Sequence, residues 1–184
     1  MRIIAGRFRG RPLTPLGKGD AGAHLRPTPD RVRESLFSML AHMDVLGDAR
    51  VLDLFAGTGA LGYEALSRGA AHVTFVENGR TGADLIRRNA ALLGVEDETA
   101  LIRRDALKLP AAPGRACDLV FLDPPYGKEL GARALAAARV GGWIARGALI
   151  VWEEAAPMPA PEGFELLDHR RYGDTHVTLL NRVD

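Results

Sequence analysis

The tetrapeptide Asp123-Pro124-Pro125-Tyr126 directly follows the apolar run 118–122 and is the sharpest chemical signal in the sequence. The Asp123 carboxylate and the Pro124 carbonyl can accept hydrogen bonds from the two N–H groups of an aromatic amine. These acceptors draw the nitrogen toward tetrahedral geometry and stabilise the positive charge that develops on it when it attacks. The two prolines stiffen the turn, and the Tyr126 ring offers a face for stacking. The pattern predicts chemistry at the exocyclic amino group of a nucleic-acid base, rather than an ordinary surface turn.

A second candidate site lies between residues 53 and 62, where an apolar strand is followed by a glycine turn and a helix. Gly57 and Gly59 have no Cβ atom, so a ligand can approach the backbone closely. Glu77 ends the next strand, where its carboxylate can accept hydrogen bonds from both hydroxyls of a ribose. Residues 57–62 also match G-x-G-x-x-G, a weak signal that NAD enzymes share.

Asp53 favours S-adenosylmethionine over a dinucleotide as the cofactor. Its carboxylate would repel the pyrophosphate of a dinucleotide but attract the ammonium and sulfonium groups of S-adenosylmethionine. A loop cap or a structural ion pair is the alternative role for Asp53. Asp105 follows the third strand and has two open roles, as acceptor for an adenine amino group or as the N-cap of a short turn. The predicted cofactor-binding residues from the strand ends are Asp53, Phe55, Gly57, Gly59, Glu77, Asn78, Asp105 and Ala106.

The elements that position these residues alternate between strand and helix patterns. Apolar runs at 51–55, 73–76, 100–102, 118–122 and 148–152 predict strands, and helical patterns cover 60–67, 81–93 and 130–139. This alternation predicts a doubly wound, mostly parallel α/β sheet that is covered by helices on both faces. Two extended segments, 164–171 and 176–181, predict an antiparallel hairpin that closes the sheet edge. Ligands bind at the carboxyl ends of the strands in such sheets, where Asp53 and Asp123 both lie.

The N-terminal segment has its own pattern. Residues 2–13 predict a small β-hairpin with Gly6 in its turn, and the stretch 14–24, rich in Pro and Gly, predicts a loop. A helix is expected to begin at Thr28, with Thr28 as N-cap and Pro29 in the first helical position.

Positive charge is concentrated in this N-terminal segment. Residues 1–34 hold eight Arg or Lys and three Asp or Glu, although the whole chain has a net charge of only +1. A polyanionic partner and a solvated basic segment fit this count equally well. Under the first interpretation, Arg7, Arg9 and Arg11 alternate along a short strand and contact RNA phosphates. Arg26 is a further predicted RNA contact.

Length and composition exclude several classes of protein. The 184 residues, of which 47% are hydrophobic and 26% charged, predict one globular domain, with a hairpin and loop at 1–25 and the core at 26–184. No apolar run can span a bilayer, and no secretory signal is expected. The single cysteine, Cys117, fits a cytoplasmic protein, and five histidines without ligand-like spacing predict no metal site. Cys117, Trp143 and Trp152 are expected in the core.

The segments 53–62 and 123–126 together resemble the amino-methyltransferases of nucleic acids. Three further segments narrow the resemblance to the bacterial 16S rRNA guanine-N2 methyltransferase family, over nearly the whole chain. They are RPTPDRVRESLF at 26–37, RIIAG at 2–6 and YGDT at 172–175.

The resemblance implies a Rossmann-like methyltransferase fold with a seven-stranded sheet and an N-terminal hairpin. It implies S-adenosylmethionine as cofactor and one guanine of 16S rRNA as target, within an assembled or assembling small subunit. It also implies that Thr28 and its neighbours hold the methionine end of the cofactor and that Glu77 holds the ribose. A monomer is expected. Asn78-Gly79-Arg80 departs from the charged pair that such enzymes often carry after the glutamate.

Four alternatives remain open. An amino-methyltransferase for adenine or cytosine of DNA uses the same tetrapeptide, but it usually carries a target-recognition domain for which this chain has little room. Protein methyltransferases that act on glutamine amides begin the tetrapeptide with Asn, whereas residue 123 is Asp. A non-catalytic rRNA-binding assembly factor is disfavoured because Asp53, Glu77 and Asp123 are all present. An NAD oxidoreductase is the most distant alternative.

Overall fold

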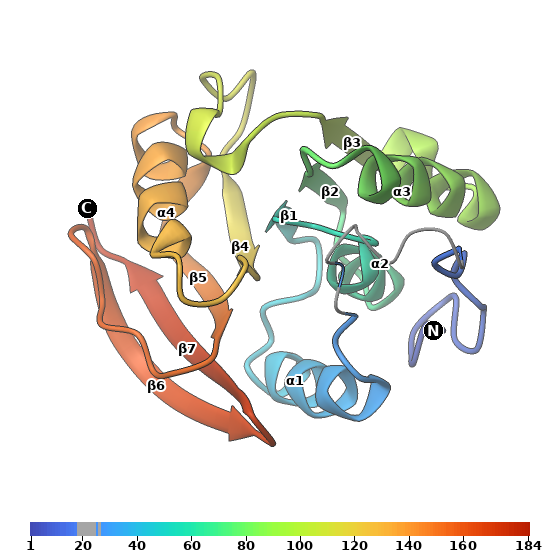
Figure 1. The fold of residues 1–184 in the computed structure, drawn as a ribbon, viewed down its shortest axis with the longest axis horizontal. Coiled ribbons are helices and arrows are strands. Elements are labelled where there is room, and N and C mark those ends of the chain that lie inside the picture. The colour runs from blue at the N-terminus through green and yellow to red at the C-terminus, as the bar shows by residue number, and fades with distance from the viewer. Residues whose placement is uncertain (18–24, 26) are drawn as a thin grey trace.

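The computed structural model describes residues 1–17, 25 and 27–184, which are built around a seven-stranded sheet (Figure 1). The strands are β1 (Arg50–Leu54), β2 (His72–Val76), β3 (Thr99–Ile102), β4 (Cys117–Leu122), β5 (Ile144–Glu154), β6 (Phe164–Tyr172) and β7 (Thr175–Arg182). The helices are α1 (Asp30–His42), α2 (Ala60–Ser67), α3 (Arg80–Leu93) and α4 (Leu130–Val140), with short 3-10 helices η1 (Glu96–Glu98) and η2 (Ala106–Lys108).

The sheet is doubly wound. Its strand order is β3-β2-β1-β4-β5-β7-β6. Strands β1 to β5 run parallel, and β7 pairs antiparallel with both β5 and β6. The predicted fold class is confirmed, including the antiparallel C-terminal hairpin. Strands β2 and β3 are added on one side of β1, whereas β4 and β5 are added on its other side. The topology therefore switches between β1 and β4, which is where sheets of this kind bind ligands.

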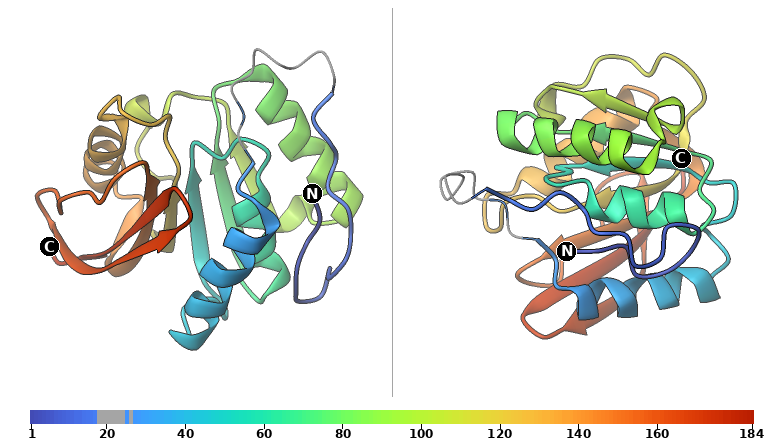
Figure 2. Two further views of the ribbon diagram at one scale, coloured as in Figure 1. Left: turned by 60° about the horizontal axis from the view of Figure 1, so that its bottom comes forward. Right: turned by 90° about the vertical axis from the view of Figure 1, so that its right-hand side faces the viewer.

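Helices cover both faces of the sheet, as two views of the ribbon show (Figure 2). Helices α1, α2 and α3 pack on one face, over a buried cluster that includes Phe37 and Phe121. Helix α4 packs on the other face, over a cluster that includes Cys117, Trp143 and Trp152, so the predicted core positions of these three are confirmed. No helix in the described part of the chain is long and apolar enough to cross a membrane.

The N-terminal residues form a narrow loop rather than a two-stranded hairpin. Arg2 and Pro12 form an isolated bridge, and the chain between them curls back through turns, in which the Arg9 amide donates to the Gly6 carbonyl over 3.1 Å. The turn at Gly6 is confirmed, since this residue has φ +85° and an added Cβ would lie 1.9 Å from the Ser67 carbonyl oxygen. The predicted strands are not formed: the two arms pair only through backbone hydrogen bonds of Met1 and Ile3 with residues 10, 11 and 13, and the turn packs against the end of α2.

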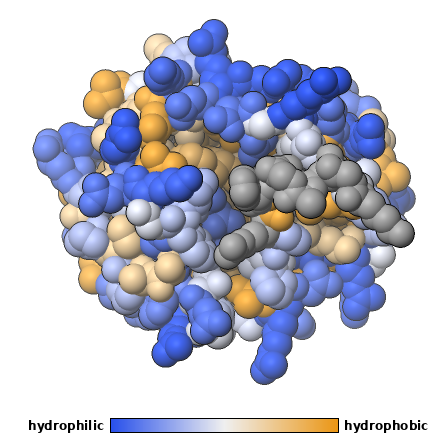
Figure 3. Space-filling model, in the orientation of Figure 1, coloured by the Kyte–Doolittle hydropathy of each residue, from blue (hydrophilic) through white to orange (hydrophobic). Residues whose placement is uncertain are grey.

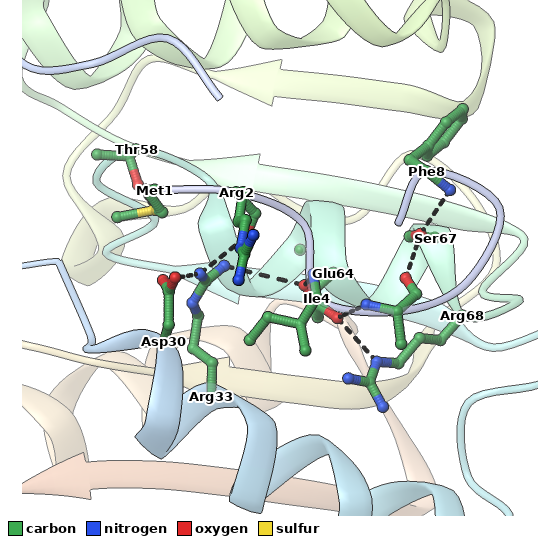
Figure 4. A network of polar contacts seen from close by, with 12 residues as sticks. Met1, Arg2, Ile4, Phe8, Asp30, Arg33, Thr58, Glu64, Ser67 and Arg68 are labelled. Atoms are coloured by element: carbon green, nitrogen blue, oxygen red, sulfur yellow. Dashed lines mark hydrogen bonds and ion pairs between the residues drawn. The ribbon is translucent and has the colours of Figure 1, made fainter. Parts of the chain in front are cut away.

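A buried ionic network fixes this loop to α2 and α1 (Figure 4). The Glu64 carboxylate accepts hydrogen bonds from the amides of Ile4 and Ala5, at 2.9 and 3.1 Å, and from Arg68 at 2.9 Å. The Arg33 side chain, fully buried on α1, donates to the Arg2 carbonyl over 2.9 Å. The Arg33 guanidinium and the Glu64 carboxylate lie 3.9 Å apart. The first residues of the chain are therefore part of the folded structure.

Helix α1 begins one residue later than the sequence predicts. Pro29 occupies the N-cap position, and Asp30 is the first helical residue. Thr28 does not cap the helix, because its hydroxyl donates instead to Glu153 at the end of β5. The remaining helices and strands agree with the predicted segments, apart from small shifts at their ends and a longer β5.

Candidate active site

The carboxyl ends of β1, β4 and β5 meet in the middle of the sheet. Strands β1 and β4 pair in register up to Leu54 and Leu122, so Asp123 lies just beyond the end of β1. Strands β4 and β5 pair up to Leu122 and Trp152, so Asp123 and Glu153 follow the last pair side by side. Hydrophilic side chains line most of the rim of the face seen in Figure 3.

Three carboxyl groups share one face of the sheet. Side chains two residues apart on a strand point to the same face. The residues two positions before Asp53, Asp123 and Glu153 all belong to the buried cluster under α1, α2 and α3; they are Val51, Phe121 and Val151. The three acids therefore converge on the same side, at the ends of three neighbouring strands.

The loop after β1 has an unusual backbone. Phe55, Gly57 and Gly59 all adopt left-handed conformations, with φ of +58°, +57° and +79°. Glycine adopts these angles freely, but for a residue such as Phe55 they cost on the order of 1 kcal/mol and often mark functional sites. The Ala56 amide ties the loop to the Val76 carbonyl on β2 over 3.0 Å. The turn is therefore held in a shape that brings bare backbone to the strand ends.

Glu77 organises the cofactor side of the site. Its two oxygens accept hydrogen bonds from the amides of Gly57, at 2.8 Å, and Gly79, at 2.7 Å. Each carboxylate oxygen keeps a second lone pair, so ribose hydroxyls can still bind here. A cavity of about 160 Å³ adjoins this carboxylate, lined by Leu25, Glu77, Gly79, Arg80, Thr81 and Gly82.

Gly82 is a site residue that the sequence analysis missed. A Cβ at this position would lie 2.8 Å from the Gly57 carbonyl oxygen and 2.9 Å from the Glu77 side chain. Only glycine lets the first turn of α3 approach the glycine loop so closely. A glycine inside the predicted helix was the available signal, because interior glycines usually have a packing or functional reason.

Asp53 has the capping contact that the sequence analysis left open as its alternative role, and its role in cofactor binding stays a prediction. Its Oδ2 atom accepts a 3.1 Å hydrogen bond from the Gly62 amide in the first turn of α2, where the helix dipole favours negative charge. Burial raises the pKa of this carboxyl well above its ordinary value, the Gly62 hydrogen bond opposes the rise, and the charges of Asp123 and Glu77 add to it. The second oxygen remains available to a cationic ligand.

The tetrapeptide at the end of β4 presents two of its four side chains to solvent. Asp123 is half-buried and Pro124 is buried, whereas Pro125 and Tyr126 are exposed. Tyr126 is 39% exposed, so one part of its ring is open to stacking. Burial of the rest raises the pKa of its phenol, and a hydrogen bond with Thr175 in the C-terminal hairpin opposes the rise.

Glu153 and Glu154 complete the acidic group, and the sequence analysis missed both. They end β5 with only 2% and 5% of their surface exposed. Glu154 holds the turn after the tetrapeptide, since its Oε1 atom accepts from the amides of Gly127 and Ala155 at 3.3 and 3.0 Å. The available signal was two acidic residues directly after a buried strand, because strand-end carboxylates in clefts are often functional.

Burial and neighbouring negative charges raise the pKa values of Asp123 and Glu153. Burial raises the pKa of Asp123 well above its ordinary value, and the charges of Glu153 and Glu154 add to this effect. Burial raises the pKa of Glu153 to about 7. No ion pair between described residues includes any of these three acids or Asp53. Nor do these residues form a His, Cys, Asp and Glu group suited to a metal ion.

The other predicted cofactor residues lie around this centre. Asp105 caps η2, because its Oδ1 atom accepts from the Leu107 amide at 2.9 Å. Of its two predicted roles, the structure therefore shows the N-cap. Ala106 is buried behind it, and Asn78 is exposed beside Glu77. Thr28 lies over the end of β5, where its hydroxyl is 3.5 Å from Glu153 Oε2.

The predicted RNA-binding arginines do not gather at this centre. Arg7 lies near the carboxyl end of α2 and forms a 2.8 Å ion pair with Glu98, which precedes β3. The carboxyl end of α2 and Glu98 both lie at the amino ends of the strands, whereas Asp123 follows the carboxyl end of β4. Arg9 is in the same turn, Arg11 follows it with its carbonyl accepting from the Ile3 amide, and Arg26 falls outside the described residues. The role of these arginines in RNA binding stays a prediction.

Comparison with protein families identifies relatives over almost the whole chain. The family described as "Conserved hypothetical protein 95" matches residues 1–181. A Haemophilus influenzae protein called ribosomal RNA small subunit methyltransferase D is 39% identical, over 94% of this chain and 89% of that protein. The Escherichia coli K12 protein of the same name is 42% identical, over 83% of this chain and 74% of that protein.

Solved structures share the same architecture. The yhhF protein of Escherichia coli superposes with a TM-score of 0.85 at 37% identity, over 100% of this chain and 98% of that chain. The Thermus thermophilus protein TTHA0928 superposes with a TM-score of 0.75 at 29% identity, over 97% of this chain and 98% of that chain.

Proposed function

Because the chain belongs to the family of the ribosomal RNA small subunit methyltransferases D, we propose that it methylates the N2 amino group of one guanine in 16S rRNA with S-adenosylmethionine. The observation that carries this proposal is the meeting of Asp123 with the glycine loop and Glu77 at the carboxyl ends of neighbouring strands. The enzyme is a methyltransferase of Rossmann-like fold.

The residues around the glycine loop fit S-adenosylmethionine. Glu77 stands where a ribose can bind, beside a cavity that can receive part of the nucleoside, and Gly82 lets α3 close in on the glycine loop. Asp53 and its acidic neighbours, which form no ion pair among the described residues, suit a ligand with two positive charges. When bound, this cofactor supplies an electrophilic methyl group on a sulfonium centre.

Asp123 and the Pro124 carbonyl activate the amino group of the base. As acceptors for its two N–H bonds, they hold the nitrogen lone pair toward the incoming methyl group and stabilise the positive charge that develops on nitrogen. The turn that carries them is fixed by proline geometry and by the Glu154 contact with Gly127. The acceptors therefore need little reorganisation during the reaction.

The target base reaches this pocket from outside the protein. An exocyclic amino group inside a helix or folded loop is inaccessible, so the base must leave its stack, and the exposed Tyr126 ring provides a face for it. A folded RNA or ribosomal particle supplies the shape that selects the target, since this chain adds little beyond the methyltransferase fold. A bacterial enzyme with this substrate acts in the cytoplasm, where small subunits assemble.

The test compares the wild type with Asp123→Asn. Small ribosomal subunits from cells that lack this methylation are incubated with labelled cofactor, and duplex DNA is the control substrate. We expect transfer to the subunits and none to DNA. The asparagine variant should bind the cofactor normally in calorimetry but lose about a hundredfold to a thousandfold in rate. Transfer to DNA alone would identify a DNA enzyme, and a normal rate for Asp123→Asn would show that Asp123 does not act on the base.

A further inference from the structure

Glu153 differs from the other carboxyl groups of the acidic centre because, among the described residues, one of its oxygens is buried without a hydrogen-bond partner. Only 2% of the residue is exposed. Its Oε2 atom receives one long hydrogen bond, 3.5 Å from the Thr28 hydroxyl, and its buried Oε1 atom has no hydrogen-bond partner in the described part of the chain. A buried acceptor without a donor costs on the order of 1–3 kcal/mol. A glutamate in this position needs either a proton or a ligand.

Its acidic neighbours are better satisfied. Asp53 accepts a hydrogen bond from the Gly62 amide, Glu77 accepts two from backbone amides, and Glu154 accepts two more. Among the described residues, the charged groups that face Glu153 are carboxylates at the ends of β1, β4 and β5 itself, the Tyr126 phenol also lies near it, and its partner on β7 is the uncharged Val177. An unpaired negative charge at Glu153 thus has nothing among the described residues to balance it.

We propose that Glu153 binds the primary ammonium group of the methyl donor and releases its own proton when this cation arrives. The proposal rests on the proposed function and adds a residue to the binding of the cofactor. An ammonium group carries three N–H donors and one positive charge, so it supplies both the missing hydrogen bond at Oε1 and the missing countercharge.

The chemistry of the unpaired oxygen selects the ammonium group over the sulfonium group. A sulfonium centre is positive but has no N–H to donate, so it cannot satisfy Oε1. Asp53 lies on the same face at the end of β1 and reinforces the attraction for a cation. The amino group of the target base is another source of N–H donors, but it carries no positive charge to balance three acids.

The proton balance follows from the state of Glu153 before binding. Burial, reinforced by the charge of Asp53, raises the pKa of this carboxyl to about 7, with the Thr28 hydrogen bond opposing the rise. At pH 7 the group therefore carries about half a proton. A bound cation lowers this pKa, so binding at pH 7 should release about half a proton per site, and more at lower pH.

Calorimetry with two ligands tests this exchange without any catalysis. S-adenosylhomocysteine retains the ammonium group but lacks the sulfonium charge, whereas 5′-methylthioadenosine lacks the whole amino-acid portion. Titrations in phosphate and in Tris, whose ionisation enthalpies differ, give the number of protons released. We expect about half a proton with S-adenosylhomocysteine at pH 7 and almost none with methylthioadenosine.

Glu153→Gln should abolish this proton release and weaken S-adenosylhomocysteine at least tenfold, while methylthioadenosine binds as before. Glu34→Gln, at an exposed position on α1, is the matched control and should behave like the wild type. Methylthioadenosine binding also reports that the variant is folded. The wild type alone provides a second test, because its proton release should increase from pH 8 to pH 6.

Two results would overturn the proposal. One is that Glu153→Gln leaves the proton release or the S-adenosylhomocysteine affinity unchanged. In that case the target base would be the candidate partner of this carboxyl. The other is a wild-type proton release that is zero at every pH. If neither ligand binds the wild type, the proposed function itself fails, which is a distinct outcome.

Discussion

Glu153→Gln should remove a pH-dependent part of the stability of the free protein. The carboxyl ionises near its ordinary pKa of 4.5 in the unfolded chain but near 7 in the folded protein. Its folded pKa is raised, so its contribution to stability is greatest below pH 4.5 and is lost as the pH rises through 7. One pKa unit corresponds to about 1.4 kcal/mol, so the loss between pH 5 and pH 8 is about 2–3 kcal/mol.

Urea unfolding at pH 5 and pH 8 measures this effect. The amide of the variant does not titrate, so the free energy of unfolding of the variant relative to the wild type should rise by about 2–3 kcal/mol between the two pH values. The comparison between pH values cancels any constant cost of burying the amide. Glu34→Gln should show no such change, because its side chain is exposed. An equal difference at pH 5 and pH 8 would refute the assignment of Glu153 as a buried, protonated carboxyl.

Three further predictions concern the glycine loop, the N-terminal loop and the reaction. Gly82→Ala should weaken cofactor binding in calorimetry, because its Cβ would press on the Gly57 carbonyl; an unchanged affinity would show that α3 can move away freely. Glu64→Ala should destabilise the protein by about 1–3 kcal/mol or more, since it removes the acceptor of the Ile4 and Ala5 amides, although Arg33 keeps its ion pair with Asp30. Trypsin should then cut the N-terminal loop faster than in Glu64→Gln, and equal cleavage would contradict this role. The rate should fall on acidification with a midpoint well above the ordinary pKa of aspartate, because Asp123 must be ionised to act and its pKa is raised; a midpoint at the ordinary value would argue against this.

Periodic patterns made most of the fold predictable. The short apolar runs that end in Leu54, Val76 and Leu122 predict parallel strands, because strands buried on both faces need continuous apolar sequence. The ends of these strands also predict where Asp53, Glu77 and Asp123 gather. Such features depend only on neighbouring residues and on the rule that the carboxyl ends of parallel strands meet at one edge.

Long-range contacts account for what the sequence did not predict. Gly6 correctly indicated a turn, but only the packing of that turn against Ser67 explains why no strand follows it. Arg7 has the charge to bind a phosphate, yet its ion pair is with Glu98, ninety-one residues away. Glu153 is an ordinary acidic residue in sequence, and its importance arises from Thr28 and Asp53, which only the folded chain brings near.

The most direct test of the central claim is nucleoside analysis of RNA after methyl transfer. Unmethylated small subunits and naked 16S rRNA are each incubated with the wild-type protein and labelled cofactor, digested, and separated by chromatography. The proposed function predicts N2-methylguanosine as the labelled product, and the comparison shows whether the particle is required. Labelled N6-methyladenosine or N4-methylcytidine, or no labelled nucleoside from either substrate, would contradict it.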